Sequence, residues 1–388
     1  MADLSITNRF SPSQAPINNG VNINFQDVAQ YINDRNAGTA TWDNVVVTNL
    51  VATNISASTS TGMKNRLINP LFAINQRQVT APGDDTYVMD CWYVLTQSNP
   101  ITVAQQALQE DGQTTNIRLT QSNASAQRLG LAQIIESTES QLLRGRSVVL
   151  SARIRSSSAQ AIRFAILENT ATPDTVTSDV VSSWTSTNYT ASNFFIAGLT
   201  VTAVGSLTPA AATWTSISLT GTVSAAADNL IVLFWTEGTF AQNETLDIGV
   251  TQLEPGTVAT VFDWRPLTQE RPLCFRYYQK TYEEGTAPGT ATNNGNLVIR
   301  RAIASETTTF YGAGFPVVMR VAPTVTWYNP SSGSSASIRN DSAGGNITVT
   351  GTDTQDPTTT KRVGSPTHAA NGLAGNIILG HYTADASL

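Results

Sequence analysis

Two carboxylates close to each other in the sequence are the first side chains that could do chemistry. Glu254 lies beside a Pro-Gly turn in the stretch TQLEPGTVATVFDWRP (residues 251–266), and Asp263 follows within the same stretch. A glycosidase needs two carboxyl groups about 5–10 Å apart, one of them with a raised pKa. An acidic residue beside a Pro-Gly turn is usually an ordinary surface group. We therefore interpret the pair as part of a turn that closes a β-domain, not as catalytic residues.

The remaining acidic and nucleophilic residues form no recognisable catalytic set. The chain has only two histidines, His368 and His381, and it lacks the G-x-S-x-G elbow that presents a nucleophilic serine. The other acidic residues that we considered show no pairing in the sequence: Asp90, Glu110, Asp111, Glu283 and Glu284. The sequence therefore predicts a protein that is not an enzyme.

No cofactor or metal site is predicted either. The stretch GLAG (residues 372–375) lacks the strand-to-helix context of a phosphate-binding loop, and no segment matches the acidic D-x-[DN]-x-[DN]-G pattern of a calcium loop. Cys91 and Cys274 lie far apart, and neither has a neighbour at metal-ligand spacing. We expect two buried, reduced thiols, and a disulfide between them stays open.

Aromatic residues in polar surroundings carry the binding hypothesis. Sugars dock by stacking their C–H faces on exposed Trp or Tyr rings, while amides and carboxylates bind their hydroxyl groups. Trp184 and Tyr189 lie in the polar stretch SSWTSTNYTASN and are candidate glycan contacts on a loop. The candidates in the last part of the chain are Trp327, Tyr328, His381 and Tyr382.

Other aromatic residues are better explained by packing. Trp92 and Trp235 lie in strongly apolar runs, which favours a place in the core. Tyr277 and Tyr278 lie in the segment ERPLCFRYYQKTYEE (residues 270–284), which is dense in aromatic and charged residues. We expect these two tyrosines to pack between domains.

The composition narrows the classes of protein that the chain can represent. Of its 388 residues, 40% are hydrophobic and only 13% are charged, about half the usual charged share. The formal net charge is -6 and no Lys/Arg cluster stands out, so nucleic-acid binding, which needs a basic face, is disfavoured. The first residues lack the basic start and apolar core of a secretory signal, and no apolar run approaches the roughly 20 residues that span a bilayer. We expect a soluble chain, made in a cytoplasm, without membrane insertion.

Residues 1–62 are predicted to form an arm with one short helix. The stretch NINFQDVAQYINDRNAG begins with Asn24 as a candidate N-cap, and Phe25, Val28 and Ile32 then fall on one apolar stripe. A helix this short does not hold itself folded. Its stripe must therefore pack against another copy of the chain, a partner or the following strand.

Residues 63–267 are predicted to form an all-β domain. Apolar and polar residues alternate in SVVLSARIR and AIRFAILEN, the period of a half-buried strand. The stretch NLIVLFWTEG is apolar on both faces, as expected of a central strand. Many strands separated by Gly/Asn/Ser turns, without long helices between them, indicate a sandwich or jelly roll rather than a βαβ fold.

The last strand of this domain carries specific expectations. In ETLDIGVTQLEPG, we expect Leu246, Ile248 and Val250 to point inward. Asp247 and Thr251 should point outward. The side chains expected to fold back over the sheet edge after this strand are Val258, Val261 and Phe262.

Residues 268–388 are predicted to form a smaller β-domain. Its strand candidates are NLVIRRAI, TVTWYN, SASIRN, NITVTG and NIILGHYTA, separated by loops rich in Gly, Ser and Thr. The predicted fold class is thus all-β, with an N-terminal arm that holds one short helix, a central jelly-roll β-sandwich and a smaller C-terminal β-domain.

Three stretches resemble a module that recurs in bacteriophage tail-fibre and other virion proteins. They are NRLINPLFAINQRQ (residues 65–78), YVMDCWYV (residues 87–94) and LEPGTVATVFDWRPLTQERPLCFRYYQK (residues 253–280). In that group they frame a jelly roll similar to carbohydrate-binding modules, followed by a small terminal domain that FPVVMRVAPTVTWYNPSSG and HYTADASL also resemble. The resemblance covers roughly residues 64–388. The chain departs from it at Cys91, where arginine is usual, and at Phe262-Asp263-Trp264, where Phe-Glu-x is more common.

The resemblance implies a structural and adhesive function. It predicts a bacteriophage fibre or spike protein that attaches to tail, portal or capsid through its N-terminus, with Phe25, Val28 and Ile32 in the anchor, and that adheres to a host-surface glycan or protein through its β-domains. The C-terminal domain would be the distal tip, and the chain would act in the virion after assembly in the host cytoplasm. A homotrimer is expected, because fibres in this group are commonly threefold. A capsid head fibre or decoration protein and a polysaccharide-degrading tail spike stay open as alternatives, and a secreted cellular binding module is disfavoured.

Overall fold

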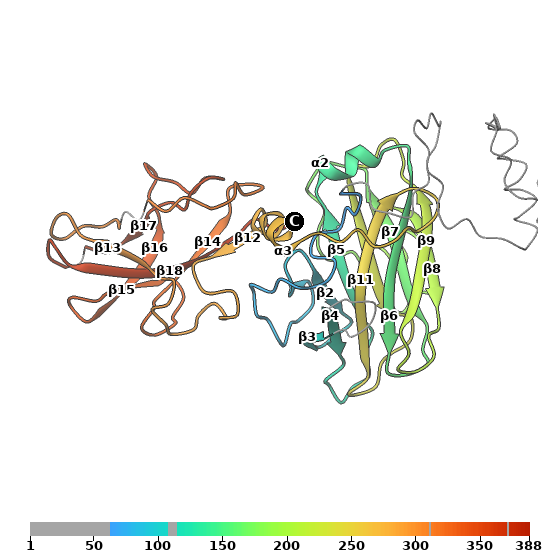
Figure 1. The fold of residues 1–388 in the computed structure, drawn as a ribbon. Helices are drawn as coiled ribbons and strands as arrows, with labels where there is room; N and C mark the ends of the chain where they lie inside the picture. Colours follow the sequence, from blue (N-terminus) through green and yellow to red (C-terminus); the bar gives the residue numbers. More distant parts are fainter. Residues whose placement is uncertain (1–62, 108–114, 310–311, 371) are drawn as a thin grey trace, which may run out of the picture. The chain divides into compact units, whose positions relative to one another are not determined.

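The computed structural model of the chain describes residues 63–107, 115–309, 312–370 and 372–388 (Figure 1). All of them belong to one compact unit, residues 57–388. The predicted arm and its helix, with Phe25, Val28 and Ile32, lie outside the described residues, as do Glu110 and Asp111. The boundary predicted between residues 267 and 268 stays a prediction.

The described residues are mostly β-structure in antiparallel sheets, which confirms the all-β prediction. The first sheet has six strands in the order β1-β2-β5-β10-β7-β8. Their bounds are β1 Thr86–Tyr87, β2 Tyr93–Thr96, β5 Leu129–Ile135, β7 Ile162–Asn169, β8 Leu199–Leu207 and β10 Asn229–Thr236. The second sheet has five strands in the order β3-β4-β11-β6-β9. Their bounds are β3 Thr102–Ala107, β4 Thr115–Thr120, β6 Ser147–Ser156, β9 Thr215–Thr222 and β11 Thr245–Pro255.

The two sheets pack face to face around a central core (Figure 1). In β6 the core side chains are Val148, Leu150, Ala152 and Ile154, the alternate positions that the sequence pattern predicts. Because side chains of a strand point alternately to the two faces of a sheet, the intervening positions of β6 lie on the outer face of the second sheet. This outer face is important below.

Strand β10 is buried on both faces, as predicted for NLIVLFWTEG. Leu230, Val232 and Phe234 belong to the central core. The alternate side chains Ile231, Leu233 and Trp235 belong to a second core on the outer face of the first sheet. The other buried residues of this second core come from β2, β5, β7 and β8 and from the irregular segment between β7 and β8: Tyr93, Leu95, Ala132, Ile134, Ala165, Leu167, Val180, Val181, Phe194, Phe195 and Leu199.

The register of β11 corrects two of the predicted side-chain directions. A β-bulge lies between Gly249 and Gln252, and Val250 has a φ of 52°. An extra residue in a bulge reverses the alternation beyond it. Val250 is therefore only partly buried and is not a core residue, whereas Thr251 is fully buried and its hydroxyl donates to the carbonyl of Pro70 over 3.0 Å.

Glu254 and Asp263 are both buried, so Glu254 is not the surface acid that the Pro-Gly turn predicts. The Glu254 carboxylate accepts hydrogen bonds from the backbone and hydroxyl of Thr260, over 2.7 and 2.6 Å. Asp263 accepts one from the backbone of Lys64 over 2.6 Å. The two acids thus fasten the closing segment and the start of the described chain to each other.

The aliphatic side chains of the closing segment do not cover the sheet edge as predicted. Val258 is 72% exposed and Val261 is 61% exposed, whereas Phe262 is half-buried. The turn after β11 is fixed by the polar contacts of Glu254, and this polar fixation leaves the two valines on the surface.

Short helices lie between β5 and β6 and after β11. They are α2 Ser137–Ser140, the 3₁₀ turn η1 Gln141–Leu143 and α3 Leu267–Phe275. Helix α3 overlaps the segment ERPLCFRYYQKTYEE (residues 270–284), and it includes Pro272, a residue that disfavours helix prediction. None of the described helices is long and apolar enough to span a membrane.

The C-terminal sheet is arranged around its longest strand, β18 (Ile377–Asp385), drawn in red in Figure 1. Strand β18 pairs with β12, β13, β14 and β15, and β15 leads through β16 to β17. The bounds are β12 Tyr278–Lys280, β13 Leu297–Arg300, β14 Thr324–Tyr328, β15 Ser337–Asn340, β16 Gly345–Thr352 and β17 Pro366–His368. The five predicted strand stretches each hold one of these strands.

The junction between the sandwich and the C-terminal sheet is tightly bonded. The guanidinium of Arg77 donates to both carboxylate oxygens of Asp385, over 2.7 and 3.0 Å, and lies 4.0 Å from the centre of the Tyr278 ring. Tyr277 and Tyr278 are buried, and their place between two domains stays a prediction. Cys91 and Cys274 are also buried, as free thiols.

Candidate functional site

Trp184 and Tyr189, the loop residues predicted to contact a glycan, help to cover the outer face of the first sheet. Trp184 packs edge-on against Phe194, with ring centroids 6.0 Å apart. The Tyr189 ring lies 5.7 Å from that of Trp235, and the guanidinium carbon of Arg163 lies 3.9 Å from its centre. Both rings are half-buried and engaged within the protein. The glycan contact predicted for them stays a prediction.

Three of the four candidates in the C-terminal sheet are core residues. His381 is 0%, Trp327 3% and Tyr382 5% exposed. Strand β14 pairs with β18 and places Trp327 opposite Tyr382, and both side chains belong to the hydrophobic core of the C-terminal sheet. A buried ring has no free face on which a sugar can stack, so we reassign these three residues from ligand contact to packing. Tyr328 is half-buried and keeps part of its surface.

His381 is held in its neutral form. Its Nε2 donates to the carbonyl of Thr292 over 2.9 Å, and its Nδ1 accepts from the hydroxyl of Thr281 over 2.8 Å. The ring stacks on Tyr282 with centroids 3.9 Å apart. Burial lowers the pKa of His381 below its ordinary value of 6.5.

Acidification is therefore expected to destabilise the protein through His381. As the pH falls below 6.5, the unfolded chain takes up the proton before the folded chain does, so this contribution to stability is complete at neutral pH and is lost in mild acid. Between about pH 7.5 and about pH 5, we expect this contribution to lower the thermal midpoint. Thermal unfolding of His381→Gln at both pH values should show a smaller difference than the parent chain. An unchanged difference between the two pH values in His381→Gln would contradict the assignment of the effect to His381. His368→Gln is the companion variant, because burial lowers the pKa of His368 too.

A row of charged and aromatic side chains crosses the outer face of the second sheet. The register places Arg118 of β4 beside Asp247 of β11, and Asp247 beside Arg155 of β6. Trp214 comes next, immediately before β9, and its ring centre lies 4.9 Å from the guanidinium carbon of Arg155. We call these four residues, Arg118, Asp247, Arg155 and Trp214, the cross-strand row.

Asp247 organises the cross-strand row. Arg118 donates from Nε and Nη2 to the two carboxylate oxygens, over 2.7 and 2.9 Å. Arg155 donates from Nε and Nη2 to Oδ2, over 2.8 and 2.6 Å. The hydrogen bond to Asp247 raises the pKa of Arg118. The Asp247 side chain is 1% exposed because the two guanidinium groups cover it, whereas Arg118 and Arg155 are 31% and 30% exposed.

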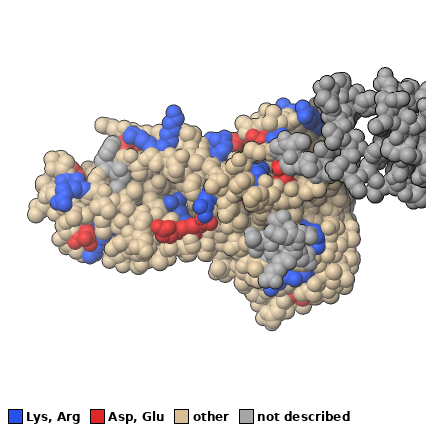
Figure 2. Space-filling view, in the orientation of Figure 1, with Lys and Arg blue, Asp and Glu red and all other residues tan. Residues whose placement is uncertain are grey.

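The cross-strand row can bind an anionic group. Two arginines and one aspartate leave one net positive charge, and each guanidinium still presents its Nη1, which makes no hydrogen bond within the described residues. Asp247 holds both guanidinium planes in place, so little side-chain entropy is lost when a ligand binds. Figure 2 shows that charged side chains are few on the face it presents and lie in small groups, so such a local excess of charge stands out from a mostly uncharged surface.

The sequence analysis did not identify the cross-strand row as a site. It predicted that Asp247 points outward, and SVVLSARIR places Arg155 on the outward positions of its strand. Nothing in the sequence around Trp214 assigned it a role. The available signal was Asp247, an outward acidic residue between the inward Leu246 and Ile248. Its partners could not be inferred because they belong to other strands.

The comparisons with known proteins give structural similarity only. No protein-family model matches this chain, and no curated protein matches it. TmCBM61, solved in complex with β-1,4-galactotriose, is 10% identical over 50% of this chain and 100% of its own, with a TM-score of 0.30. The enzymatically active domain of tailspike protein 4 from bacteriophage CBA120 is 11% identical over 50% of this chain and 21% of its own, with a TM-score of 0.30.

A third similar structure is the C-terminal family 22 carbohydrate-binding module of xylanase 10B from Clostridium thermocellum. It is 12% identical over 49% of this chain and 97% of its own, with a TM-score of 0.28. Similarity at this level carries no argument about the ligand or activity of this chain. The β-sandwich described above rests on the chain's own strand pairing.

Proposed function

We propose that this chain is a bacteriophage fibre or spike protein that adheres to a host-surface glycan, and that the glycan carries an anionic group. The observation that supports the binding step is the cross-strand row, in which a buried aspartate holds two partly exposed arginines beside a tryptophan. The virion role is supported by the three stretches that resemble fibre modules. The binding role is supported by the geometry of the row.

The chemistry of the row favours an acidic sugar over a neutral one. A carboxylate, sulfate or phosphate on the sugar would accept hydrogen bonds from the Nη1 atoms of Arg118 and Arg155, and such charge-assisted bonds are about twice as strong as neutral ones. The half-buried Trp214 ring would pack against the C–H face of the same or the next sugar. Each contact is weak, so adhesion would depend on several copies acting together.

The attachment part of the proposal concerns the remainder of the chain. The N-terminal residues, including Phe25, Val28 and Ile32, would bind tail, portal or capsid proteins, and three copies would assemble into one fibre. The protein would then be located on the surface of the virion. Locating the chain in intact particles by immunogold labelling is expected to mark a fibre, and labelling of capsid faces alone would favour a head decoration protein.

The binding proposal predicts a large effect of Trp214→Ala. Titration calorimetry with an oligogalacturonate and a neutral galactan oligosaccharide should show tighter binding of the acidic probe, and the substitution should weaken this binding about tenfold, because it removes the ring that packs on the sugar, a contact of about 0.5–1.5 kcal/mol beyond its buried area. Trp264→Ala is the matched control, since Trp264 is 62% exposed and lies outside the row. Equal binding of both probes, or an unchanged affinity in Trp214→Ala, would reject the site.

A further inference from the structure

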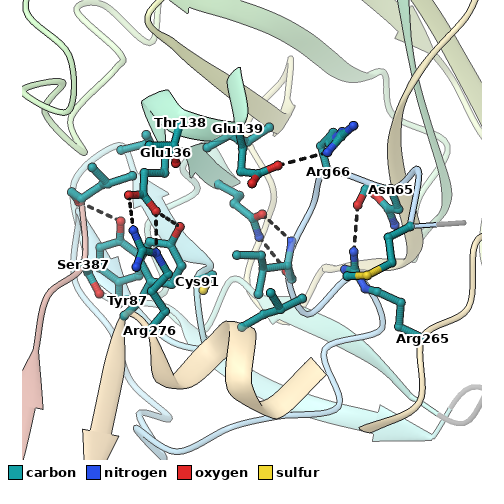
Figure 3. Close-up of a pocket in the computed structure, with 18 residues that line it drawn as sticks. Asn65, Arg66, Tyr87, Cys91, Glu136, Thr138, Glu139, Arg265, Arg276 and Ser387 are labelled. Atoms are coloured by element: carbon teal, nitrogen blue, oxygen red, sulfur yellow. Dashed lines mark hydrogen bonds and ion pairs between the residues drawn. The ribbon is translucent and has the colours of Figure 1, made fainter. Parts of the chain in front are cut away.

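A cavity separate from the cross-strand row lies where the sandwich meets the residues around α3 (Figure 3). Its volume is about 400 Å³, at the lower end of the roughly 300–1,000 Å³ of ligand pockets. Five parts of the chain line it: residues 63–68, residues 87–91, residues 133–139 at the end of β5 and in α2, residues around α3, and residues 387–388. None of the four residues of the cross-strand row belongs to its lining.

The rim of this cavity is built from two ion pairs. Glu136 accepts from Nε and Nη2 of Arg276, over 2.9 and 2.6 Å, and from the hydroxyl of Tyr277 over 2.9 Å. Glu139 accepts from Nη1 of Arg66 over 3.0 Å. Figure 3 shows the two pairs at separate positions around the cavity, with the Glu136 pair beside Tyr87 and the Arg66 pair toward Asn65.

The walls between the ion pairs are apolar. The aliphatic and aromatic residues in the lining include Ile68, Tyr87, Ile134, Ile135, Leu273, Tyr277 and Leu388. Apolar walls with a few polar groups at the rim suit a ligand that has both C–H faces and hydroxyl groups.

The charges in the lining are balanced. Arg66 pairs with Glu139, Arg276 with Glu136, and the third lining arginine, Arg265, with the buried Glu270 over 2.8 Å. A charged ligand would find no unpaired opposite charge here and would lose its hydration without compensation. The cavity therefore discriminates against the acidic sugars that the cross-strand row favours.

The cavity still offers donors and acceptors to a neutral ligand. The Nε atom of Arg66 is buried and makes no hydrogen bond within the described residues, and a buried donor without a partner costs about 1–3 kcal/mol. Glu139 is 48% exposed and has one carboxylate oxygen outside its bond to Arg66. A sugar hydroxyl can accept from Arg66 and donate to Glu139 at the same time.

From these observations we propose that the cavity binds one neutral pyranose unit, as a second glycan site whose ligand class differs from that of the cross-strand row. The sugar ring packs on the apolar walls, and its hydroxyls bind Arg66 and Glu139. Because the lining comes from both the sandwich and the residues around α3, the bound sugar contacts both. This site does not depend on the proposed binding at the cross-strand row.

The full chain and a neutral methyl pyranoside test this proposal. Saturation-transfer NMR and titration with methyl β-galactoside, methyl β-glucoside and galacturonate are expected to show binding of at least one neutral pyranoside, with a Kd of about 1–10 mM. Galacturonate should bind the cavity at least about tenfold more weakly, measured in an Asp247→Asn background, in which binding at the cross-strand row is expected to be abolished. No neutral binding at about 50 mM ligand, or equal binding of galacturonate in that background, would overturn the proposal.

Two substitutions locate the binding. Thr138→Trp places a large side chain at the cavity mouth and is expected to weaken pyranoside binding by about tenfold or more. Arg66→Lys keeps the charge but removes Nε, and should weaken binding about fivefold. Leu142→Trp is the control because Leu142 is 56% exposed and outside the lining. Matched thermal unfolding of the three variants guards against misfolding, and unchanged affinity in a folded Thr138→Trp would refute the site.

Discussion

Replacing Asp247 by asparagine is expected to abolish acidic-glycan binding and to lower the free energy of unfolding by about 2–4 kcal/mol. The substitution keeps the size of the side chain but removes the charge that accepts four hydrogen bonds from Arg118 and Arg155. Two guanidinium groups would then face each other without compensation, and neither would keep its position for a ligand. The expected loss lies below that of a fully buried pair because both arginines are about a third exposed.

Denaturant unfolding and titration with the acidic probe measure the two effects separately. Asp228→Asn is the matched control, because Asp228 forms a similar short ion pair, 2.6 Å from Arg144, at a more exposed position. We expect this control to lose no more than about 1 kcal/mol and to bind the probe normally. If Asp247→Asn were as stable as the control, the buried aspartate would not organise the row.

Trp235→Ala is expected to lower the free energy of unfolding by about 3–5 kcal/mol, the cost of emptying a large core site. Trp235 is fully buried on the outer face of the first sheet, stacked on Phe194 with centroids 5.0 Å apart. Its removal would also loosen the segment between β7 and β8, which covers that face through Phe194 and Phe195. Increased amide exchange in this segment, with little change in the central core, is the expected signature.

Two further variants sharpen the Trp235 prediction. Trp235→Phe should cost less than about 1.5 kcal/mol, because the indole N–H is buried without a partner within the described residues and its loss leaves no unmet hydrogen bond. Trp264→Ala, at a site 62% exposed, should change stability by no more than about 0.5 kcal/mol. A loss in Trp235→Ala no larger than that in Trp264→Ala would show that the outer core does not stabilise the fold.

The strands could be predicted from the sequence because their signal is local. Alternation in SVVLSARIR defines the inward face of β6, and the continuous apolar run of β10 requires cover on both sides. The prediction failed where one local feature changed the register. The bulge between Gly249 and Gln252 reverses the alternation of β11, and nothing in the apolar pattern of that stretch marks its position.

The candidate site was harder to predict because its members are distant in sequence. Arg118 and Arg155 lie 129 and 92 positions from Asp247, and only strand pairing brings them together. The same pairing buries Trp327, His381 and Tyr382 in the C-terminal core. Burial depends on what the rest of the chain places over a side chain, and a short polar or apolar window does not contain that information.

The sequence by itself therefore determined the all-β class, the strand stretches and the outward direction of Asp247, because each depends on the two-residue period of a strand. The tertiary structure alone decided which arginines flank Asp247 and which aromatic residues are buried. It also buried Glu254, predicted to be a surface acid, where it binds Thr260, and it buried Asp263, which binds Lys64. These outcomes depend on contacts between segments that are distant in the sequence. Lys64 and Asp263, for example, are 199 positions apart. Packing and register set such contacts, and neither is encoded in a local pattern.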